Sequence, residues 1–292
     1  MSSFNPNTLR AFAQVAELGS FSAAAERLEI SQPAVSLQIR QLERRFGVKL
    51  IERVGRRATP TPAGEELLRH ARSIEAALDA ATQAMQPHTA KIAGRVRIGT
   101  GATACIYLLP PILRALRERY PSLEIVVSTG NTAEMLRSVE ENRIDIGLVT
   151  LPAPGRMFEV KPLADDEFVA IAPAKGPRLP REVTPALLAT FPLVFYEPAA
   201  NTRHLIDEWF LRARLAPKPV MQLGSVEAIK QLVGAGLGCS VLPRMAVPGQ
   251  QAGLVVRSLK PRLSRKLALV LRRDKPLSHG LRALMAAITQ AC

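Results

Sequence analysis

The sequence of 292 residues predicts an α/β protein in which a small helical unit precedes a long helix and a larger unit of alternating strands and helices. Three observations support this order. Two short helical patterns follow each other within residues 19–47, apolar residues repeat in heptads over 67–85, and strand and helix patterns alternate from residue 95 onward. The length accommodates two or three domains, each large enough to bury a core.

Residues 19–47 have the pattern of a helix-turn-helix. Ser31 can cap the second helix, because its side-chain oxygen can accept a hydrogen bond from an exposed backbone amide. Apolar residues then recur every three or four positions, which predicts an inward face made by Val35, Ile39, Leu42 and Phe46. The other face carries Gln32, Ser36, Gln38, Arg40 and Arg44. Their amide, hydroxyl and guanidinium groups match base edges and phosphates, so the helix suits the major groove of DNA.

The flanking segments extend this motif. A helix over about 8–18, capped by Asn7, is expected to support the pair, and Ser22 is expected to open the second helix. Residues 48–52 predict a strand, and the turn at 53–57 that follows is rich in arginine. The segment therefore predicts a winged helix-turn-helix whose wing carries positive charge to the phosphate backbone.

The net charge of +14 indicates a polyanionic partner, and this charge is unevenly distributed. Residues 32–60, which include the expected recognition helix and wing, hold seven basic and two acidic side chains. Residues 254–292 hold nine basic side chains and one acidic one. Leu267, Leu269 and Leu271 alternate there with Lys266, Ala268 and Val270, which predicts a sheet strand with charged ends, so that the basic side chains belong to a solvated surface. The alternative is a surface that assists DNA wrapping or attracts anions.

A heptad pattern follows the wing. Apolar positions fall at intervals of four and three residues, at Leu67, Ala71, Ile74, Leu78, Ala81 and Met85. A repeat of 3.5 residues predicts a coiled-coil seam, and hence dimerisation through this helix. The alternative is a helix that packs on its own chain. Residues 91–94 are expected to form a hinge.

The alternation beyond residue 95 predicts parallel sheets with helices on both faces. Two such units, of about 75 to 100 residues each, would face one another across a cleft. Asp165, Asp166 and Glu167 are interpreted as a loop between strands. The expected strands lie near 95–100, 123–128, 144–149, 159–163, 166–172, 193–196, 219–223, 239–242, 254–258 and 266–272, and the expected helices include 133–141, 203–213, 226–236 and 279–290.

Several classes of protein are disfavoured. The four histidines and three cysteines have no metal-ligand spacing, so no metal or other cofactor is expected. Gly234, Gly236 and Gly238 lie after a helix and before a strand, the reverse of a dinucleotide site, and no nucleophile motif suggests an enzyme. The sequence has no signal-peptide pattern and no apolar run of membrane length, so we expect a cytoplasmic protein with no membrane partner.

Together these segments resemble the LysR-type transcriptional regulators over essentially the whole chain. The most specific match is residues 21–53, FSAAAERLEISQPAVSLQIRQLERRFGVKLIER, followed by TPTPAG at 59–64. Further support comes from LLPPILRALRERYPSLEI at 108–125, RIDIGLV at 143–149 and VGAGLGCSVLP at 233–243. Ile51 stands where the family usually has Phe, which should alter packing under the wing.

The resemblance implies a regulator whose winged heads bind two half-sites of an interrupted inverted repeat in double-stranded promoter DNA. Its linker helices would pair in a homodimer or homotetramer, and RNA polymerase is a further candidate partner. A periplasmic-binding-protein-like domain would hold a small effector between two subdomains. In these terms the DNA-binding domain covers 1–62, the linker helix 63–89 and the regulatory domain 90–292, with subdomain I at about 93–162 and 267–292 and subdomain II at about 163–266.

Base-edge contacts are assigned to the start of the recognition helix and phosphate contacts to the wing. Gln32 can pair with adenine, Pro33 can contact a thymine methyl, and Arg40 can meet a guanine or a phosphate. Phosphate contacts orient the head without reading sequence. The candidate DNA-binding residues are Gln32, Pro33, Ser36, Gln38, Arg40, Arg53, Arg56 and Arg57.

Candidate effector-binding residues gather where helices are expected to begin after strands. Unpaired backbone amides at such positions favour an anionic group, such as a carboxylate or sulfate. These turns are also where open α/β sheets bind ligands. Each polar side chain can instead be a helix cap that needs no ligand. The candidates are Thr100, Thr103, Asn131, Thr132, Asn201, Thr202, Ser225 and Val226.

A thiol redox sensor of the same family is the alternative function. Such members carry paired cysteines near the segment that corresponds here to 196–204, which contains none. Cys105 and Cys239 remain as candidates for such a role. A solute-binding protein would match only the C-terminal half, and an enzyme has still less support from the pattern.

Overall fold

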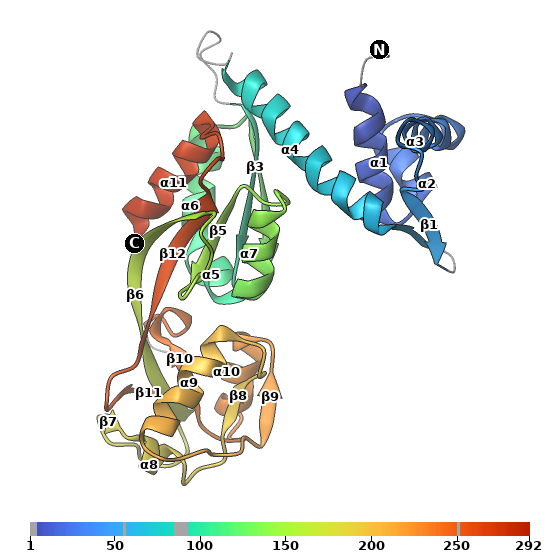
Figure 1. Cartoon of the computed structure of the whole chain (residues 1–292). Coiled ribbons are helices and arrows are strands. Elements are labelled where there is room, and N and C mark those ends of the chain that lie inside the picture. The colour runs from blue at the N-terminus through green and yellow to red at the C-terminus, as the bar shows by residue number, and fades with distance from the viewer. Residues whose placement is uncertain (1–4, 55–56, 85–92, 250–251) are drawn as a thin grey trace. The chain divides into compact units, whose positions relative to one another are not determined.

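The computed structural model describes residues 5–54, 57–84, 93–249 and 252–292. The chain forms two compact units, Met1–Met85 and Gln86–Cys292, which we call the head and the regulatory unit. Figure 1 shows the elements of each unit. Within the described ranges, no helix has the length and apolar character needed to cross a membrane.

The head combines three short helices, a two-stranded wing and one long helix. Ser31 caps the recognition helix α3 as predicted, because its hydroxyl accepts a hydrogen bond from the Ala34 amide at 3.3 Å. Val35 and Ile39 on the inner face of α3 are buried with Phe12 of the first helix, so the three helices share one core. The elements are α1 (Pro6–Leu18), α2 (Phe21–Arg27), α3 (Gln32–Phe46), β1 (Ile51–Val54), β2 (Arg57–Pro60) and α4 (Pro62–Ala84).

Two helix caps differ from the sequence-based prediction. Asn5, rather than Asn7, caps α1, and its side chain accepts a hydrogen bond from the Asn7 amide at 2.9 Å. The helix begins earlier because Pro6 already has the φ angle of a first helical residue. Ser20, rather than Ser22, caps α2, because it is the residue with the extended backbone that a cap requires.

The end of α3 also differs from expectation. Phe46 was predicted on the buried face, but it is 44% exposed at the last position of the helix. The strand predicted over 48–52 starts only at Ile51. The Glu43 carboxylate accepts the backbone amides of Leu50 and Ile51, at 3.1 and 3.5 Å, and this holds the preceding residues in a turn.

The wing is anchored by the segment that follows it. Thr61 donates its hydroxyl to the Lys49 carbonyl at 2.7 Å and accepts the Gly64 amide at 3.1 Å. A Cβ at Gly64 would lie 2.1 Å from the Leu50 carbonyl oxygen, a distance that no side chain can occupy. Glycine at this position is therefore required for α4 to start against the wing.

The first subdomain of the regulatory unit is a sheet with helices on both faces. Ile98 and Leu148 are buried with α6 and α11 on one face, while Val149 is buried with α7 on the other. The elements are β3 (Gly94–Thr100), α5 (Ala102–Tyr107), α6 (Leu109–Arg119), β4 (Leu123–Thr129), α7 (Thr132–Glu140), β5 (Ile146–Thr150), β12 (Ser264–Arg272) and α11 (His279–Ala291).

The second subdomain is built around the buried Trp209 and Phe210, whose ring centroids are 5.0 Å apart. The indole of Trp209 donates a hydrogen bond to the Pro261 carbonyl at 2.7 Å. The elements are β6 (Phe158–Pro173), β7 (Glu182–Val183), α8 (Pro185–Leu188), β8 (Val194–Tyr196), α9 (Asn201–Arg212), β9 (Met221–Leu223), α10 (Val226–Gly234), β10 (Ser240–Pro243), the 3-10 turn η2 (Arg244–Ala246) and β11 (Leu254–Leu259).

Strands β6 and β12 join the two subdomains (Figure 1). Residues 158–167 of β6 pair with β12, and residues 168–173 pair with β10 and β11. The two strands predicted near 159–163 and 166–172 are therefore one strand, and the loop predicted at Asp165, Asp166 and Glu167 is wrong. The prediction of parallel sheets is also wrong in part, since β3, β4 and β5 are parallel but β12 is antiparallel to both β5 and β6.

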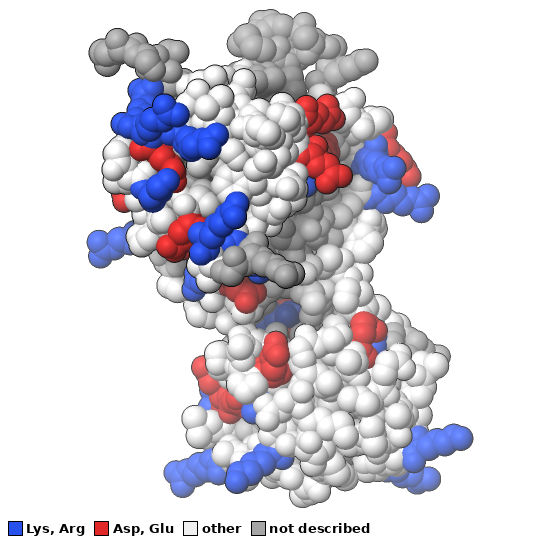
Figure 2. Space-filling model, turned by 90° about the vertical axis from the view of Figure 1, so that its right-hand side faces the viewer, with Lys and Arg blue, Asp and Glu red and all other residues white. Residues whose placement is uncertain are grey.

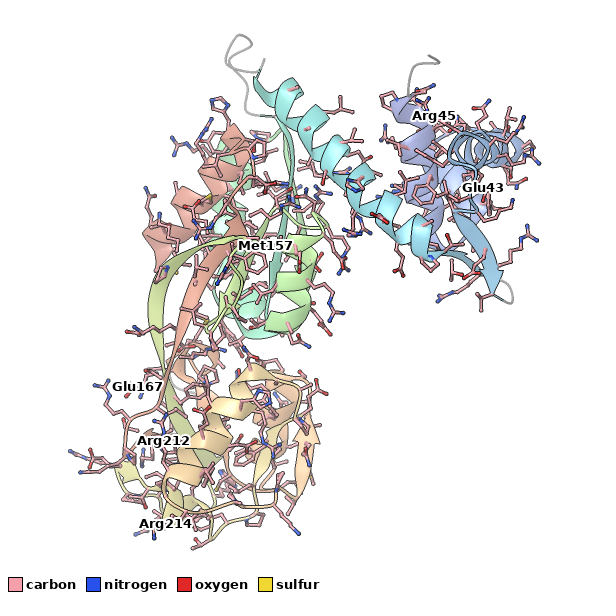
Figure 3. The ribbon with its side chains drawn as sticks, in the orientation of Figure 1. Glu43, Arg45, Met157, Glu167, Arg212 and Arg214 are labelled. Atoms are coloured by element: carbon pink, nitrogen blue, oxygen red, sulfur yellow. The ribbon has the colours of Figure 1, made fainter. Side chains whose placement is uncertain are left out.

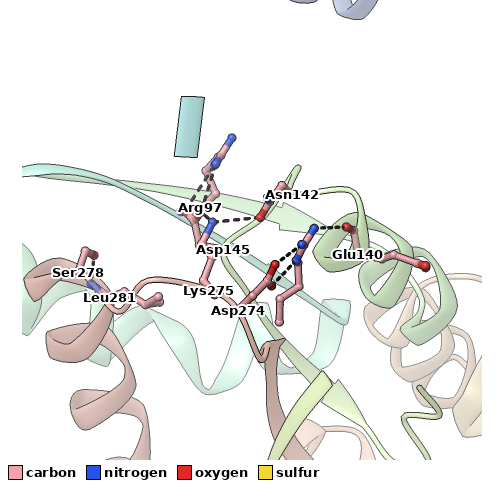
Figure 4. Close-up of polar contacts among 9 residues, drawn as sticks. Arg97, Glu140, Asn142, Asp145, Asp274, Lys275, Ser278 and Leu281 are labelled. Atoms are coloured by element: carbon pink, nitrogen blue, oxygen red, sulfur yellow. Dashed lines mark hydrogen bonds and ion pairs between the residues drawn. The ribbon is translucent and has the colours of Figure 1, made fainter. Parts of the chain in front are cut away.

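A buried ion cluster fixes one end of the first subdomain (Figure 4). Asp145 accepts the Arg97 amide and the Lys275 ammonium, each at 2.7 Å. Lys275 also donates to Asn142 Oδ1 at 3.2 Å. Burial opposes the charged carboxylate, but Lys275 and Arg97 outweigh that effect and lower the pKa of Asp145. The cluster ties β3 and the turn before β5 to the segment that precedes α11.

Candidate functional site

The exposed start of α3 presents three predicted DNA-facing residues on one side. Gln32, Ser36 and Arg40 are spaced by four residues, which aligns them along a helix. Gln32 Nε2 donates a hydrogen bond to Ser36 Oγ at 2.9 Å, so these two side chains are oriented together. Pro33 and Arg40 are exposed beside them. This surface has the donors, acceptors and apolar ring that base edges require.

Gln38 does not lie on this surface, although the sequence analysis placed it there. It follows Gln32 by six residues and therefore lies about 240° around the helix axis from it. Its side chain is half-buried, and Oε1 is buried with no hydrogen-bond partner among the residues that the structure describes. Helical geometry thus places Gln38 next to the inward-facing Leu42 rather than beside Arg40.

Glu43 holds the recognition helix against the base of the wing. Besides the two backbone amides described above, its carboxylate accepts the Lys49 ammonium at 2.8 Å. Burial opposes ionisation, but the hydrogen bonds from Lys49 and from the backbone outweigh it and lower the pKa of Glu43. Figure 3 labels this side chain within the head. The sequence shows Glu43 only as one of the two acidic side chains of residues 32–60.

The wing and α3 share one shallow groove. A hollow of about 210 Å³ is lined by Ser36 and Arg40 of α3 and by Arg53 of β1. Arg53 and Arg57 are both exposed. Arg56 lies outside the described residues. The structure therefore brings together a predicted base-reading residue, Arg40, and a predicted phosphate-binding residue, Arg53.

The predicted dimerisation seam on α4 has two different parts. Ala71 is buried, and Leu67 is half-buried against the core of the head. Helix α4 contacts α1 of the same chain. This start of α4 follows the alternative of packing on its own chain. Ile74 and Leu78 are 37% and 48% exposed, and Ala81 is exposed as well. Met85 lies outside the described residues.

A cavity of the regulatory unit lies between its two subdomains. This cavity, of about 300 Å³, is bordered by the starts of α5 and α7 in the first subdomain and of α9 and α10 in the second. Six of the eight predicted effector-binding residues line it: Thr103, Asn131, Thr132, Asn201, Thr202 and Val226. Four helices therefore begin at the wall of this one cavity.

Thr100 and Ser225 do not line the cavity. Thr100 is fully buried and donates its hydroxyl to the Leu148 carbonyl at 2.9 Å, a contact between strands. Ser225 caps α10, and its hydroxyl accepts a hydrogen bond from the Ala228 amide. Both residues are satisfied within the fold, as in the capping alternative. Asn201, which was expected before a helix, is instead the first residue of α9.

The floor of the cavity contains groups that sequence reasoning missed. Arg265 of β12 is 5% exposed, and its Nε donates to Asp166 Oδ2 of β6 at 2.9 Å. Its Nη1 contacts the Thr202 hydroxyl at 3.4 Å. Tyr196 lies at the end of β8 with 6% exposure, and burial raises the pKa of its phenol well above the usual range. Arg265 was counted only within a basic stretch, and Tyr196 was assigned only to a strand.

Two carboxylates stand at the rim of the same cavity. Glu134 forms a capping box with Asn131, in which each side chain accepts the other residue's backbone amide, at 2.9 and 3.0 Å. Glu197 follows Tyr196 and is exposed. The lining therefore combines two acidic side chains with one arginine whose charge is already offset by Asp166.

Beside the cavity, Tyr107 links the two subdomains. It is the last residue of α5, and its hydroxyl contacts the Glu227 carboxylate and accepts the Lys230 ammonium at 2.7 Å. Glu227 and Lys230 belong to α10, and Lys230 is 8% exposed. We call these three residues the Tyr107 cluster. Helices α5 and α10 thus both border the cavity and contact each other next to it.

The basic C-terminal stretch is largely neutralised within the fold. Five of its nine basic side chains form ion pairs: Lys260, Arg262, Arg265, Arg272 and Lys275. Figure 2 shows acidic and basic side chains interspersed over the face that it presents. The five ion pairs fit the interpretation as a charged surface of the fold better than a second DNA-binding surface.

The cysteines lie in different environments. Cys105 on α5 is half-buried, Cys239 is buried, and Cys292 is exposed. Burial raises the pKa of the Cys239 thiol, which disfavours the reactive thiolate. Among the described residues, no three histidine, cysteine or acidic side chains gather closely enough to hold a metal ion.

Comparisons with known proteins agree with both units. Residues 6–65 match the bacterial regulatory helix-turn-helix family of lysR type, and residues 89–292 match the LysR substrate binding domain. The regulator CbbR of Xanthobacter flavus is 34% identical over 95% of this chain and 85% of its own, and YeiE of Escherichia coli is 34% identical over 95% and 94%. The structure of a full-length OxyR variant from Pseudomonas aeruginosa has 25% identity and a TM-score of 0.81, covering 99% of this chain and 95% of that one. These families and relatives are transcriptional regulators rather than enzymes, and the chain belongs to the LysR-type transcriptional regulators.

Proposed function

We propose that this regulator recognises promoter DNA through α3 and the wing, and that a small molecule bound between the subdomains of the regulatory unit controls its activity. It acts in the cytoplasm, as a homodimer or homotetramer paired through the exposed part of α4. The observation that carries the proposal is the cavity onto which four helix starts converge. The effector bears an anionic group, because helix starts offer unpaired amides and partial positive charge.

The DNA contacts divide into two classes. Gln32, Ser36 and Arg40 contact base edges, since they share one exposed side of α3. Arg53 and Arg57 of the wing, with Arg56, contact phosphates and orient the head. Loss of a base contact should therefore reduce discrimination between sequences, whereas loss of a phosphate contact should weaken binding to all sequences.

A footprint on the DNA that flanks the protein's own gene, with and without candidate metabolites, tests the whole proposal. A protected interrupted inverted repeat that changes with one metabolite is the expected result. Binding titrations with Arg40→Ala and Gln38→Ala separate the two sides of α3. Arg40→Ala should lose sequence discrimination, and Gln38→Ala should retain it. The proposed function would be contradicted if no DNA were protected, or if no metabolite changed the protected region.

The likeness to OxyR raises the thiol-sensor alternative, for which Cys105 and Cys239 are the candidates. Replacing both cysteines with serine tests it directly. If small-molecule binding controls the protein, the footprint of the double variant should still respond to the effector. A footprint that responds only to oxidant, and only while both cysteines are present, would favour the alternative.

A further inference from the structure

We propose that the effector is a zwitterion of the α-amino acid type, whose carboxylate binds at the floor of the cavity and whose ammonium group binds Glu197 at the rim. This inference rests on the proposed function, because it assumes that the cavity between the subdomains is the effector site. It goes further by assigning a cationic group to the ligand.

The floor holds two buried donors that the fold leaves incompletely used. The Tyr196 hydroxyl is buried and interacts with the Thr103 side chain, but no hydrogen bond of full geometry satisfies it within the described part of the chain. Arg265 Nη2 lies 2.9 Å from Asp166 Oδ2, yet that contact lacks the direction of a hydrogen bond, and Nη2 has no other partner among the described residues. Buried donors without acceptors are rare in proteins. A ligand carboxylate supplies acceptors for both, and the Thr103 and Thr202 hydroxyls line the same space.

The rim has the opposite charge. The Glu134 carboxylate is engaged by the Asn131 amide. In contrast, the Glu197 carboxylate has no hydrogen bond or ion pair within the residues that the structure describes. It also lies against Gly224, where a Cβ would be 3.2 Å from Glu197 Oε1, so its backbone surroundings restrict where the carboxylate can go.

The floor and the rim of the cavity together favour one chemical class of ligand. A simple dianion such as sulfate would be attracted by the helix starts but repelled by Glu134 and Glu197, with only Arg265 to offset them. A ligand with a carboxylate and an ammonium group meets a complementary partner at each end. The cavity of about 300 Å³ is at the small end of ligand sites, which fits a molecule of amino-acid size.

Calorimetric titration of the full-length protein tests this inference. The probes are the twenty standard α-amino acids and, for each one that binds, its desamino carboxylic acid and its decarboxylated amine. At least one amino acid should bind. Both of its analogues should bind at least about ten-fold more weakly, since each loses one charge-assisted contact. Equal or tighter binding of the desamino acid, or no binding by any amino acid, would overturn the inference.

Three variants locate the two contacts. Glu197→Gln should weaken binding of the amino acid, while the affinity for its desamino analogue should stay unchanged or rise, because a negative charge that repels the carboxylate is removed. Tyr196→Phe should weaken both ligands by the same factor. Glu159→Gln is the matched control, because Glu159 is an exposed carboxylate of β6 that does not line the cavity. If Glu197→Gln and Glu159→Gln behave alike, the ammonium contact is refuted.

The metabolite-dependent footprint keeps this inference separate from the proposed function. A footprint that changes with a carboxylate lacking an amino group would leave the proposed function in place and overturn the zwitterion. A footprint that changes with no metabolite, while amino acids bind in the calorimeter, would instead separate binding from regulation and contradict the proposed function.

Discussion

Replacing Asp166 with asparagine should destabilise the regulatory unit strongly, because it leaves a buried guanidinium without its counter-charge. Asp166 and Arg265 are 7% and 5% exposed, and Nε donates to the carboxylate at 2.9 Å. Asp166 also accepts the Met245 amide at 3.1 Å. Asparagine keeps the size of the side chain but removes the charge, and Arg265 cannot lose its proton in compensation. Breaking one partner of such a buried pair costs about 3–5 kcal/mol.

The adjacent residue provides a matched control. Glu167 pairs with Arg262 at 3.0 Å and with Arg244 at 3.4 Å, and these arginine side chains are 81% and 48% exposed. Figure 3 labels Glu167 on the outer side of the molecule, at the level where β6 joins the two subdomains. Ion pairs exposed in this way contribute about 0–1 kcal/mol, so Glu167→Gln should have little effect.

Urea unfolding followed by tryptophan fluorescence measures both changes. Trp209 is the single tryptophan of the chain and is buried in the second subdomain, so its emission reports on the regulatory unit alone. With a slope of about 2 kcal/mol per molar urea, Asp166→Asn should lower the midpoint by about 1.5–2.5 M, and Glu167→Gln by less than about 0.5 M. Equal shifts for the two variants would refute the argument that burial decides the cost.

Three other contacts lead to predictions of their own. The lowered pKa of Asp145 means that its ion cluster stabilises the fold above the pKa of the unfolded carboxyl and is lost as pH falls through the folded value. The stability difference between the wild type and Asp145→Asn should therefore be full at pH 7 and shrink below about pH 4, as measured by urea midpoints across pH. Gly64→Ala should unfold or rearrange the base of the wing, because its Cβ would meet the Leu50 carbonyl oxygen, and DNA binding should fall while the Trp209 transition stays unchanged. Tyr107→Phe should destabilise the regulatory unit by about 1–3 kcal/mol, because the buried Lys230 ammonium loses an acceptor, and an unchanged urea midpoint would show that this contact adds nothing.

The head could be predicted closely because its signals are local. Ser31 and the residues that follow it carry a cap and an apolar period within a single helix, and both features are present in the structure. The errors arose from where a residue lies along or around the helix. Phe46 continues the apolar period but lies where the helix ends, and Gln38 shares the composition of the exposed face but not its angle.

The cavity could be predicted only at its edges. Helix starts after strands are visible in the sequence, so Thr103, Thr132 and Thr202 were placed correctly on its lining. Arg265 and Asp166 are 99 residues apart, and only the long pairing of β6 with β12 brings them together. Neither the spacing of apolar residues nor the amino-acid composition reveals a contact between residues so far apart in the sequence. The acidic triplet consequently resembled a loop, although one of its members is a buried counter-ion.

The position of the Tyr107 cluster explains how a ligand in the cavity can act on the relation between the subdomains. Thr103 lines the cavity from α5, and Tyr107 follows one turn later on the same helix. Val226 lines the cavity from α10, and Lys230 follows one turn later on that helix. Any ligand that draws the starts of α5 and α10 together or apart must therefore also move Tyr107 relative to Lys230. Because Lys230 is buried, separation of this contact is unfavourable, and the cluster favours one spacing of the subdomains over others.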